Sequence, residues 1–295
     1  MPVCHLGASR GAANLAASIE DILGSHRTGR PVLVGILNVT PDSFSDGGEF
    51  LDPASAVQQA RKLAADGADV LDVGAESTRP GSQRVSPADQ IARLREVLPE
   101  VVRIGPLVSI DTTRPEVAEF ALAAGAVIVN DVSAGREDPR ILRLAGERGC
   151  ALVLMHMLGQ PKSMQENPTY HDVVAEVRDF LSERLAAAES AGVPRQRCIV
   201  DPGIGFGKRL EHNLALLGNL QALTELGCPV MVGPSRKRFI GELTDQKQPS
   251  RRVPGTVAAC VMAQLGGATI FRVHDVAEVL EGLRVAGAIR GFRPD

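Results

Sequence analysis

Ionisable and amide side chains in this sequence recur directly after short apolar runs. The most informative are Asp111, Asn130 and Asp201. Together they would supply two carboxylate acceptors and one amide that both donates and accepts. That set suits a flat heterocycle with adjacent N–H donors and a carbonyl, such as the 2-amino-4-oxo-pyrimidine edge of a pterin or guanine. Each Asp alone could instead cap a helix or form a turn, and Asp111, which precedes Thr112-Thr113-Arg114-Pro115, is placed for either role.

Basic side chains follow other apolar runs. They are Arg79, the stretch Arg236-Lys237-Arg238, and Arg272 with His274. Lone basic residues are usually solvated, but Arg272 lies between Phe271 and Val273, where an unpaired buried charge would be costly. We therefore expect these cations to meet an anionic leaving group or a carboxylate.

Two glycine-containing segments, Pro41 to Gly48 and Ser77 to Gly81, carry charged residues. Such loops can close over a site and exclude water, although ordinary surface loops have similar composition. The sequence contains no Ser-His-Asp order, H-E-x-x-H or Walker A run. It therefore predicts neither a covalent nucleophile nor a tight metal cage.

The elements that must position these residues are eight apolar runs, each followed by a segment with helical spacing. The predicted strands are Val32 to Leu37, Val70 to Val73, Leu107 to Ile110, Val127 to Val129, Leu152 to Met155, Ile199 to Val200, Val230 to Val232 and Ile270 to Val273. Helix boundaries are indicated by Asp52-Pro53 with Gly67, Ser86-Pro87, Arg114-Pro115 with Gly125, and Asp138-Pro139 with Gly149.

Eight such units predict an α/β fold, a (β/α)8 TIM barrel whose active site lies at the carboxyl ends of the strands. The basic residues after the seventh and eighth strands match the usual phosphate site of these barrels. A doubly wound open sheet is the main competitor, but Gly203-Ile204-Gly205-Phe206-Gly207 lacks the G-x-G-x-x-G spacing of a dinucleotide site.

Composition limits the other possibilities. The 295 residues, 44% of them apolar, predict one barrel domain over residues 31–295. Residues 1–30 are expected to form an N-terminal extension with a short amphipathic helix from Leu15 to Leu23. A net charge of −3 without blocks of like charge predicts neither a nucleic acid nor a membrane as partner. Five scattered cysteines, without a signal peptide or apolar span, indicate a cytoplasmic protein with small buried thiols.

Seven blocks of the sequence resemble the dihydropteroate synthase family in that family's order. They are NVTPDSFSDGG at 38–48, ESTRPG at 76–81, SIDT at 109–112, NDVS at 130–133, DPGIGFGK at 201–208, SRKRF at 235–239 and RVHDV at 272–276. The resemblance implies condensation of 6-hydroxymethyl-7,8-dihydropterin diphosphate with p-aminobenzoate, giving 7,8-dihydropteroate and diphosphate. It also implies a homodimer formed through outer helices of the barrel.

The resemblance implies roles for residues in each block. Asp111, Asn130, Asp201 and Lys237 resemble the pterin pocket, and Arg272 with His274 resembles the diphosphate site, with Arg272 also covering the pterin face. Asn38 resembles the Mg²⁺ contact and Thr78 a residue lining the substrate site. Phe44, Asp46, Arg79 and Pro80 resemble the loop residues that close to make the p-aminobenzoate site. Weaker candidates for contacting p-aminobenzoate are Phe206, Ser235 and Arg238.

The expected mechanism is a dissociative substitution, because diphosphate is a good leaving group and the dihydropterin can delocalise the cation left on its methylene carbon. The residues expected to be catalytic are Asp46, Arg79, Asp111, Asp201, Lys237 and Arg272, acting by positioning and electrostatic stabilisation. One Asn oxygen with substrate phosphate and water suits Mg²⁺ as the cofactor.

Two alternatives remain open at this stage. A methyltetrahydrofolate-type methyltransferase shares the barrel and a polar pterin edge, but it does not need the blocks after Asn38, Ser235 and Arg272. A non-catalytic paralogue would bind pterin without turnover, and it does not need Asp46 and Arg79. The chain departs from the family at Ala75, where Gly is common, and in its first thirty residues, which shorter members lack.

Overall fold

The computed structural model describes residues 18–40, 52–77, 84–159 and 164–291. Its centre is a ring of eight parallel strands in the order β6-β5-β4-β3-β2-β1-β8-β7, and a parallel bridge between Val200 and Val230 joins the two ends of that order. The strands are β1 (Val32–Asn38), β2 (Val70–Gly74), β3 (Leu107–Asp111), β4 (Ile128–Asp131), β5 (Ala151–Met155), β6 (Cys198–Asp201), β7 (Met231–Val232) and β8 (Ile270–Val273). The predicted (β/α)8 barrel is confirmed, and the bounds of each predicted strand lie within two residues of those observed.

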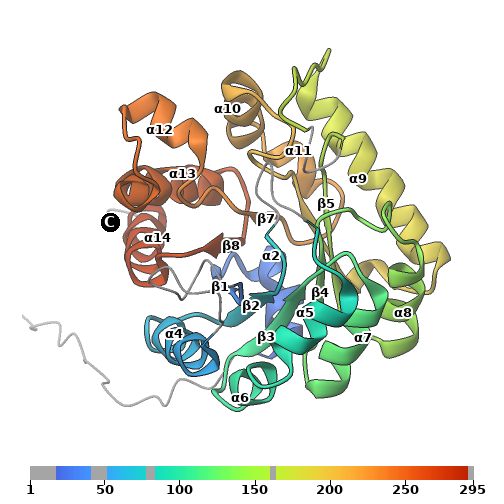
Figure 1. Ribbon diagram of the computed structural model, residues 1–295. Coiled ribbons are helices and arrows are strands. Elements are labelled where there is room, and N and C mark those ends of the chain that lie inside the picture. The colour runs from blue at the N-terminus through green and yellow to red at the C-terminus, as the bar shows by residue number, and fades with distance from the viewer. Residues whose placement is uncertain (1–17, 41–51, 78–83, 160–163, 292–295) are drawn as a thin grey trace, which may run out of the picture.

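The helices surround the strands as an outer layer (Figure 1). They are α4 (Pro53–Ala65), α5 (Pro87–Leu94), α6 (Leu98–Val102), α7 (Pro115–Ala124), α8 (Arg140–Arg148), α9 (Val173–Ser190), α10 (Leu210–Gly218), α11 (Gln221–Thr224), α12 (Arg238–Thr244), α13 (Val253–Leu265) and α14 (Val276–Gly291), with 3-10 turns at Arg195–Arg197 and Pro249–Arg252. Their inward faces and the outward faces of the strands form the main apolar core.

Local sequence explains where several of these helices begin and end. Proline occupies the first position of α4, α5 and α7, where a missing N–H costs no hydrogen bond. Asp52 and Ser86 accept hydrogen bonds from the first free N–H groups of α4 and α5. Gly125 ends α7 with a φ of 113°, a conformation that glycine adopts at little cost. These boundaries agree with the signals read from the sequence.

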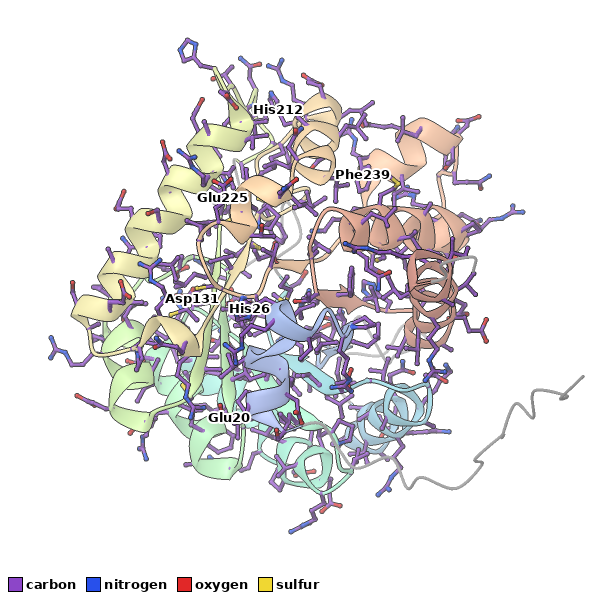
Figure 2. The ribbon with its side chains drawn as sticks, turned by 180° about the vertical axis from the view of Figure 1, so that it is seen from behind. Glu20, His26, Asp131, His212, Glu225 and Phe239 are labelled. Carbon is purple, nitrogen blue, oxygen red and sulfur yellow. The ribbon has the colours of Figure 1, made fainter. Side chains whose placement is uncertain are left out.

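Inside the barrel, the end that holds the strands' amino termini is apolar. Its layer includes Val32, Val70 and Ile128, and it is covered by Ile22 and Leu23. These two residues belong to α1 (Ile19–Leu23), which is followed by α2 (Ser25–Thr28). Figure 2, seen from this side, shows the two short helices lying across the end of the barrel.

The N-terminal segment therefore contributes to the core. The predicted helix from Leu15 to Leu23 is observed as α1 over Ile19–Leu23, while residues 15–17 lie outside the described part of the chain. Ser25 of α2 is fully buried, and its hydroxyl lies 2.9 Å from that of Thr269, just before β8. The division at residue 30 stays a prediction, but the described part of the extension packs as the floor of the barrel.

Two further observations concern the chain as a whole. No helix of the described residues is both long and apolar enough to cross a membrane. Cys150, Cys198, Cys228 and Cys260 are free thiols and are buried, as the sequence predicted for its cysteines. Cys4 lies outside the described residues.

Candidate functional site

The carboxyl ends of the strands bring the predicted polar residues to the opposite end of the barrel. Asp111 ends β3, and the parallel register places it beside Gly74 of β2 and Asn130 of β4. Asp201 ends β6 in register with Met155 of β5. Asp111, Asn130 and Asp201 are 7%, 3% and 4% exposed, so the mouth of the barrel holds a buried polar set.

Arg272 of β8 joins this set through two carboxylates. Its Nε donates to Asp72 Oδ2 at 2.6 Å, and its Nη2 donates to Asp111 Oδ2 at 2.7 Å. The side chain is 20% exposed, so it keeps some access to solvent while both bonds are made. The sequence argument that an arginine inside a buried strand must be paired is therefore confirmed. Asp111 is not a helix cap, because α7 begins after Arg114.

Asp72 is a member of this cluster that sequence reasoning missed. It lies in the middle of β2, is 1% exposed, and also accepts a hydrogen bond from Asn130 Nδ2 at 3.0 Å. The available signal was an acidic residue inside the apolar run Val70-Leu71-Asp72-Val73. The reasoning that singled out Arg272 applies equally to this position.

Burial perturbs the acids of the mouth. The pKa of Asp111 rises to about 7, mainly because burial disfavours its charged form and although the charge of Arg272 opposes the change. Burial also raises the pKa of Asp201, against a backbone hydrogen bond from Gly203 and the charges of Lys237 and Arg272. Burial alone would lower the pKa of Arg272, but Asp72 and Asp111 raise it above its ordinary value. The site thus holds a permanent cation, Arg272, beside the Asp111 carboxyl, whose pKa lies close to neutrality.

Lys237 approaches the same cluster from the loop after β7. Its Nζ donates to the carbonyl oxygen of Ile204 and lies 4.5 Å from the centre of the Phe206 ring. Burial lowers the pKa of Lys237 to about 8, although the charge of Asp201 favours the protonated form. Lys237, Phe206 and Asp201 therefore form one side of the mouth.

The loop after β6 is fixed by a second buried lysine that the sequence reasoning gave no role. Lys208 Nζ lies 2.9 Å from His156 Nδ1 and donates to the carbonyl oxygens of Gly203 and Phe206 at 3.0 Å. Gly203 has a φ of 66°, and a Cβ there would lie 1.9 Å from the carbonyl oxygen of His156. Asp201 Oδ1 accepts from the Gly203 N–H at 2.7 Å, so this Asp also forms a turn, as the sequence allowed.

The other predicted residues after β7 and β8 divide into two groups. His274 Nδ1 lies 2.9 Å from Ser235 Oγ. This contact joins the segment after β7 to the residue that follows β8, close in sequence to Arg272. Arg236 pairs with Asp275 at 2.5 Å. Arg238, in contrast, is 85% exposed and pairs with Glu242 one turn along α12. The structure therefore places Ser235 and His274 near the cluster and Arg238 on the surface.

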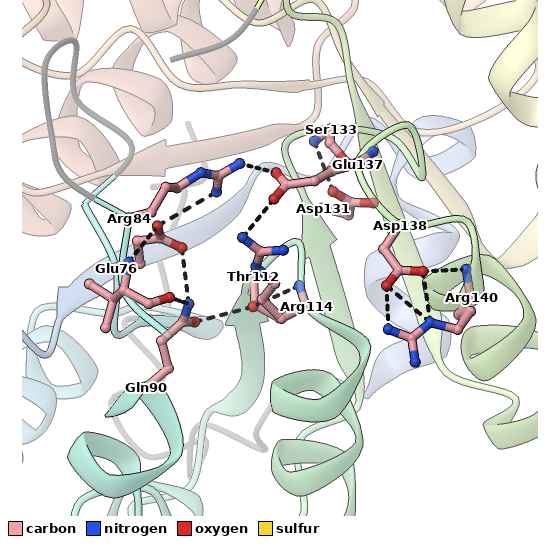
Figure 3. Close-up of polar contacts among 11 residues, drawn as sticks. Glu76, Arg84, Gln90, Thr112, Arg114, Asp131, Ser133, Glu137, Asp138 and Arg140 are labelled. Carbon is pink, nitrogen blue, oxygen red and sulfur yellow. Dashed lines mark hydrogen bonds and ion pairs between the residues drawn. The ribbon is translucent and has the colours of Figure 1, made fainter. Parts of the chain in front are cut away.

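A polar network flanks the mouth between the ends of β2, β3 and β4 (Figure 3). Glu76 accepts a hydrogen bond from Gln90 Nε2 at 3.0 Å and lies 3.5 Å from Arg84. Arg84 also pairs with Glu137, and Thr112 donates to Gln90 Oε1 at 3.4 Å. This network ties the segment after β2 to the residue that follows Asp111.

Five predicted site residues cannot be placed. They are Phe44, Asp46, Thr78, Arg79 and Pro80, which lie outside the described residues. Asn38 is placed, at the end of β1 and in register with Gly74. In the described part of the chain, no group of three His, Cys, Asp or Glu side chains could hold a metal ion. The partly exposed Asn38 amide is a hard oxygen donor of the kind that suits Mg²⁺ shared with substrate phosphate and water.

The chain is similar to known proteins over most of its length. The profile of a family described as "Pterin binding enzyme" matches residues 34–274. Dihydropteroate synthase of Synechocystis sp. is 45% identical over 261 residues, which cover 88% of this chain and 90% of that protein. A structure of Xanthomonas albilineans dihydropteroate synthase with 4-aminobenzoic acid is 46% identical, with a TM-score of 0.84, over 90% of this chain and 94% of the other. The same organism's enzyme in complex with 7,8-dihydropteroate has a TM-score of 0.81 at 44% identity and covers 90% of this chain and 95% of the other.

Proposed function

The chain belongs to the dihydropteroate synthase family of pterin-binding enzymes, and we propose that the mouth of its barrel carries out that family's condensation. It is a transferase of folate biosynthesis, which joins 6-hydroxymethyl-7,8-dihydropterin diphosphate to p-aminobenzoate and releases diphosphate. The observation that carries the residue roles is the buried hydrogen-bonded set of Asp72, Asp111, Asn130 and Arg272.

We assign pterin binding to the carboxyl ends of β3, β4 and β6. Asp111 and Asp201 would accept hydrogen bonds from the pterin N–H groups, and the Asn130 amide, which donates to Asp72, would accept one through its oxygen. Lys237 would donate to the pterin carbonyl, since its ammonium lies on the Asp201 side of the mouth. One face of the flat ring would be covered by the guanidinium of Arg272.

We assign the diphosphate to Arg272 of β8 and to His274, the first residue after that strand. The hydrogen bond between the Ser235 hydroxyl and Nδ1 of His274 fixes the imidazole at the carboxyl end of β8, where the departing phosphate would lie. Mg²⁺, when bound by Asn38, substrate phosphate and water, would neutralise negative charge on the leaving group. The p-aminobenzoate site would combine Phe206 and Ser235 with the loop residues Phe44, Asp46, Thr78, Arg79 and Pro80, and Arg238 remains a weaker candidate.

The substitution would then be dissociative. The bond from the methylene carbon to the diphosphate oxygen breaks with its electron pair going to diphosphate. The positive charge left on the pterin is favoured by Asp201, Asp111 and the loop carboxylate of Asp46. The neutral aniline nitrogen of p-aminobenzoate forms the new carbon–nitrogen bond and then loses a proton. Apart from holding both substrates in line, the protein supplies only fixed charges.

The test is direct. Purified protein is mixed with Mg²⁺, the dihydropterin diphosphate and radiolabelled p-aminobenzoate, and labelled dihydropteroate is measured against samples that lack Mg²⁺ or carry Arg272→Ala. We expect product that depends on both. If pterin diphosphate binds by calorimetry but no product forms, the protein is a non-catalytic pterin binder and the proposed turnover is wrong.

We also propose that two copies associate through α13 and α14. Neighbouring parts of these adjacent helices expose apolar side chains: Met262 (58%), Leu265 (50%), Val285 (60%) and Ile289 (71%). Single exposed apolar residues are ordinary, but a group on two adjacent helices is typical of an interface. Light scattering should give twice the chain mass, and the pair Met262→Glu and Ile289→Glu should give the monomer. A monomeric wild-type protein at micromolar concentration would exclude this dimer.

We place the protein in the cytoplasm. The four described cysteines are unpaired, which fits a reducing compartment. Fractionation of cells that express the tagged protein would test this assignment.

A further inference from the structure

Asp72 has a different environment from every residue assigned to substrate above. It lies one layer deeper than Asp111, in register with Ile36 of β1 and Ser109 of β3. Its side chain points into the barrel, where it lines a small cavity of about 10 Å³ together with Ser109 and Asn130. Because it lies one layer below Asp111 and its hydrogen bonds go to Arg272 and Asn130, we expect a substrate at the mouth to meet those two residues and not Asp72.

Its two hydrogen bonds go to two residues that do reach the mouth. Asp72 Oδ2 accepts both from Arg272 Nε and from Asn130 Nδ2. Arg272 is thereby fixed at two of its three guanidinium nitrogens, because Nη2 is held by Asp111. Two such bonds define the plane of a guanidinium, which a single bond would leave free to rotate.

The bond to Asn130 fixes the direction of its amide. A buried carboxylate only accepts hydrogen bonds, so the atom of Asn130 that faces Asp72 must be the NH2 group. The amide oxygen of Asn130 then points away from Asp72. Asn130 therefore presents its amide oxygen to a ligand, and this oxygen can accept a hydrogen bond from an N–H group.

A contribution to fold stability does not explain why an acid stands at position 72. Its Oδ1 is buried without a hydrogen-bond partner among the described residues, as is Oδ1 of Asp111. A buried acid with an unpaired oxygen costs stability, and a buried ion pair is rarely more stable than apolar side chains of similar volume. Most of the other side chains that line this cavity are apolar, among them Val34, Ile128 and Val153.

We propose that Asp72 is a positioning residue, which fixes the guanidinium of Arg272 and the amide of Asn130 in the orientations that bind the pterin diphosphate. The inference rests on the proposed function of this mouth. It assigns no contact between Asp72 and either substrate. Its consequence is that the loss of Asp72 weakens the site for the pterin diphosphate and leaves the site for p-aminobenzoate intact.

The experiment compares Asp72→Ala and Asp72→Asn with the wild-type protein and with Ser109→Ala as the matched control. Ser109 is the strand neighbour of Asp72, is 2% exposed and lines the same cavity. We expect Asp72→Ala to lower kcat/KM for the pterin diphosphate by roughly 10- to 100-fold, the usual range for a group that orients binding residues. KM for p-aminobenzoate should stay within about threefold.

Asp72→Asn should recover part of the loss, because its amide oxygen can still accept from Arg272 Nε. Ser109→Ala should behave as wild type. Far-ultraviolet circular dichroism and Tm of each variant report whether it folds. An equal loss of kcat/KM in Asp72→Ala and Ser109→Ala would overturn the proposal, and so would an increase in both KM values of Asp72→Ala. Absence of turnover in the wild-type protein would instead overturn the proposed function.

A double-mutant cycle separates positioning from a general structural effect. If Asp72 acts through Arg272, Asp72→Ala should cost at least fivefold less in an Arg272→Ala background than in the wild-type background. The remaining loss measures the part that acts through Asn130. The same fold-loss in both backgrounds would show that Asp72 does not act through Arg272.

Discussion

The two ends of the barrel interior bury opposite kinds of side chain, apolar at one end and charged at the other. At the amino-terminal end, Val32, Val70 and Ile128 meet Ile22 of α1 in an apolar layer. At the carboxyl-terminal end, acids and bases are buried together, and two carboxylate oxygens lack a hydrogen-bond partner among the described residues. Apolar burial stabilises the fold, whereas buried charge does so only when every group is paired. The difference indicates that the first end maintains the barrel and the second end maintains a binding site at some cost in stability.

The largest expected effect comes from removing the cation of the polar end. Arg272→Ala should lower kcat/KM for the pterin diphosphate on the order of 10²- to 10³-fold, because a buried charged donor to a leaving group is lost. Arg272→Lys keeps the charge but cannot reproduce the two bonds to Asp72 and Asp111, so its activity should be intermediate. Steady-state kinetics with both substrates varied would measure this. Near-normal kinetics in Arg272→Ala would falsify the assigned diphosphate site.

The polar end should also make stability depend on pH. Because burial raises the pKa of Asp111 to about 7, the folded protein binds more protons than the unfolded chain between about pH 4 and pH 7. The stabilisation from this proton is present at low pH and is lost as pH rises through 7. Relative to Asp111→Asn, the wild-type free energy of unfolding should fall by roughly 2 to 4 kcal/mol from pH 4 to pH 8.

Urea unfolding of both proteins at several pH values gives this difference. Ile22→Ala serves as the control, since an apolar change at the other end should displace the wild-type curve without altering its slope against pH. Parallel curves for the wild-type protein and Asp111→Asn would show that Asp111 ionises normally in the folded protein.

The two ends also differ in how far sequence could predict them. The eight strands and the helix boundaries depend on local signals, such as the apolar run before Asn38 or the Pro115 and Gly125 that bound α7, and these were predicted correctly. Asp111, Asn130, Asp201 and Arg272 were identified because each follows or interrupts an apolar run. Their convergence then followed from the geometry of a barrel.

What the sequence could not show is which polar groups pair. Asp72 and Arg272 are 200 positions apart, and Asp111 and Arg272 are 161 apart, so no local pattern connects them. The pKa of Asp111 likewise depends on burial that only the closed barrel creates. The contribution of α1 was unknown for the same reason, since its partners on the barrel floor come from many strands.

The apolar end should respond to substitution in stability and not in catalysis. Ile22 is 1% exposed, and Ile22→Ala should lower the free energy of unfolding by about 2 kcal/mol. This value is near the lower limit for removing a buried Ile side chain, because the five-residue helix α1 can shift to fill part of the cavity. Values of kcat and both KM should match the wild-type protein below its Tm. Leu243→Ala, a change at a 56% exposed position of α12, is the matched control. A catalytic defect in Ile22→Ala would mean that the two ends are coupled.

The smallest expected effect concerns an ion pair at the apolar end and its contribution to the free energy of unfolding. Glu20 of α1 pairs with Arg197 at 3.1 Å, but the carboxylate side chain is 69% exposed. An ion pair in that setting contributes about 0.5 kcal/mol or less, because water and salt screen it. Glu20→Gln should therefore change the free energy of unfolding by no more than about 0.5 kcal/mol, and Arg197→Gln in the same background should add nothing measurable. A coupling energy above about 1 kcal/mol in the double-mutant cycle would contradict the view that α1 is held by Ile22 and Leu23. A small coupling would show that the charges at this end contribute little to stability, as the apolar packing of Ile22 and Leu23 predicts.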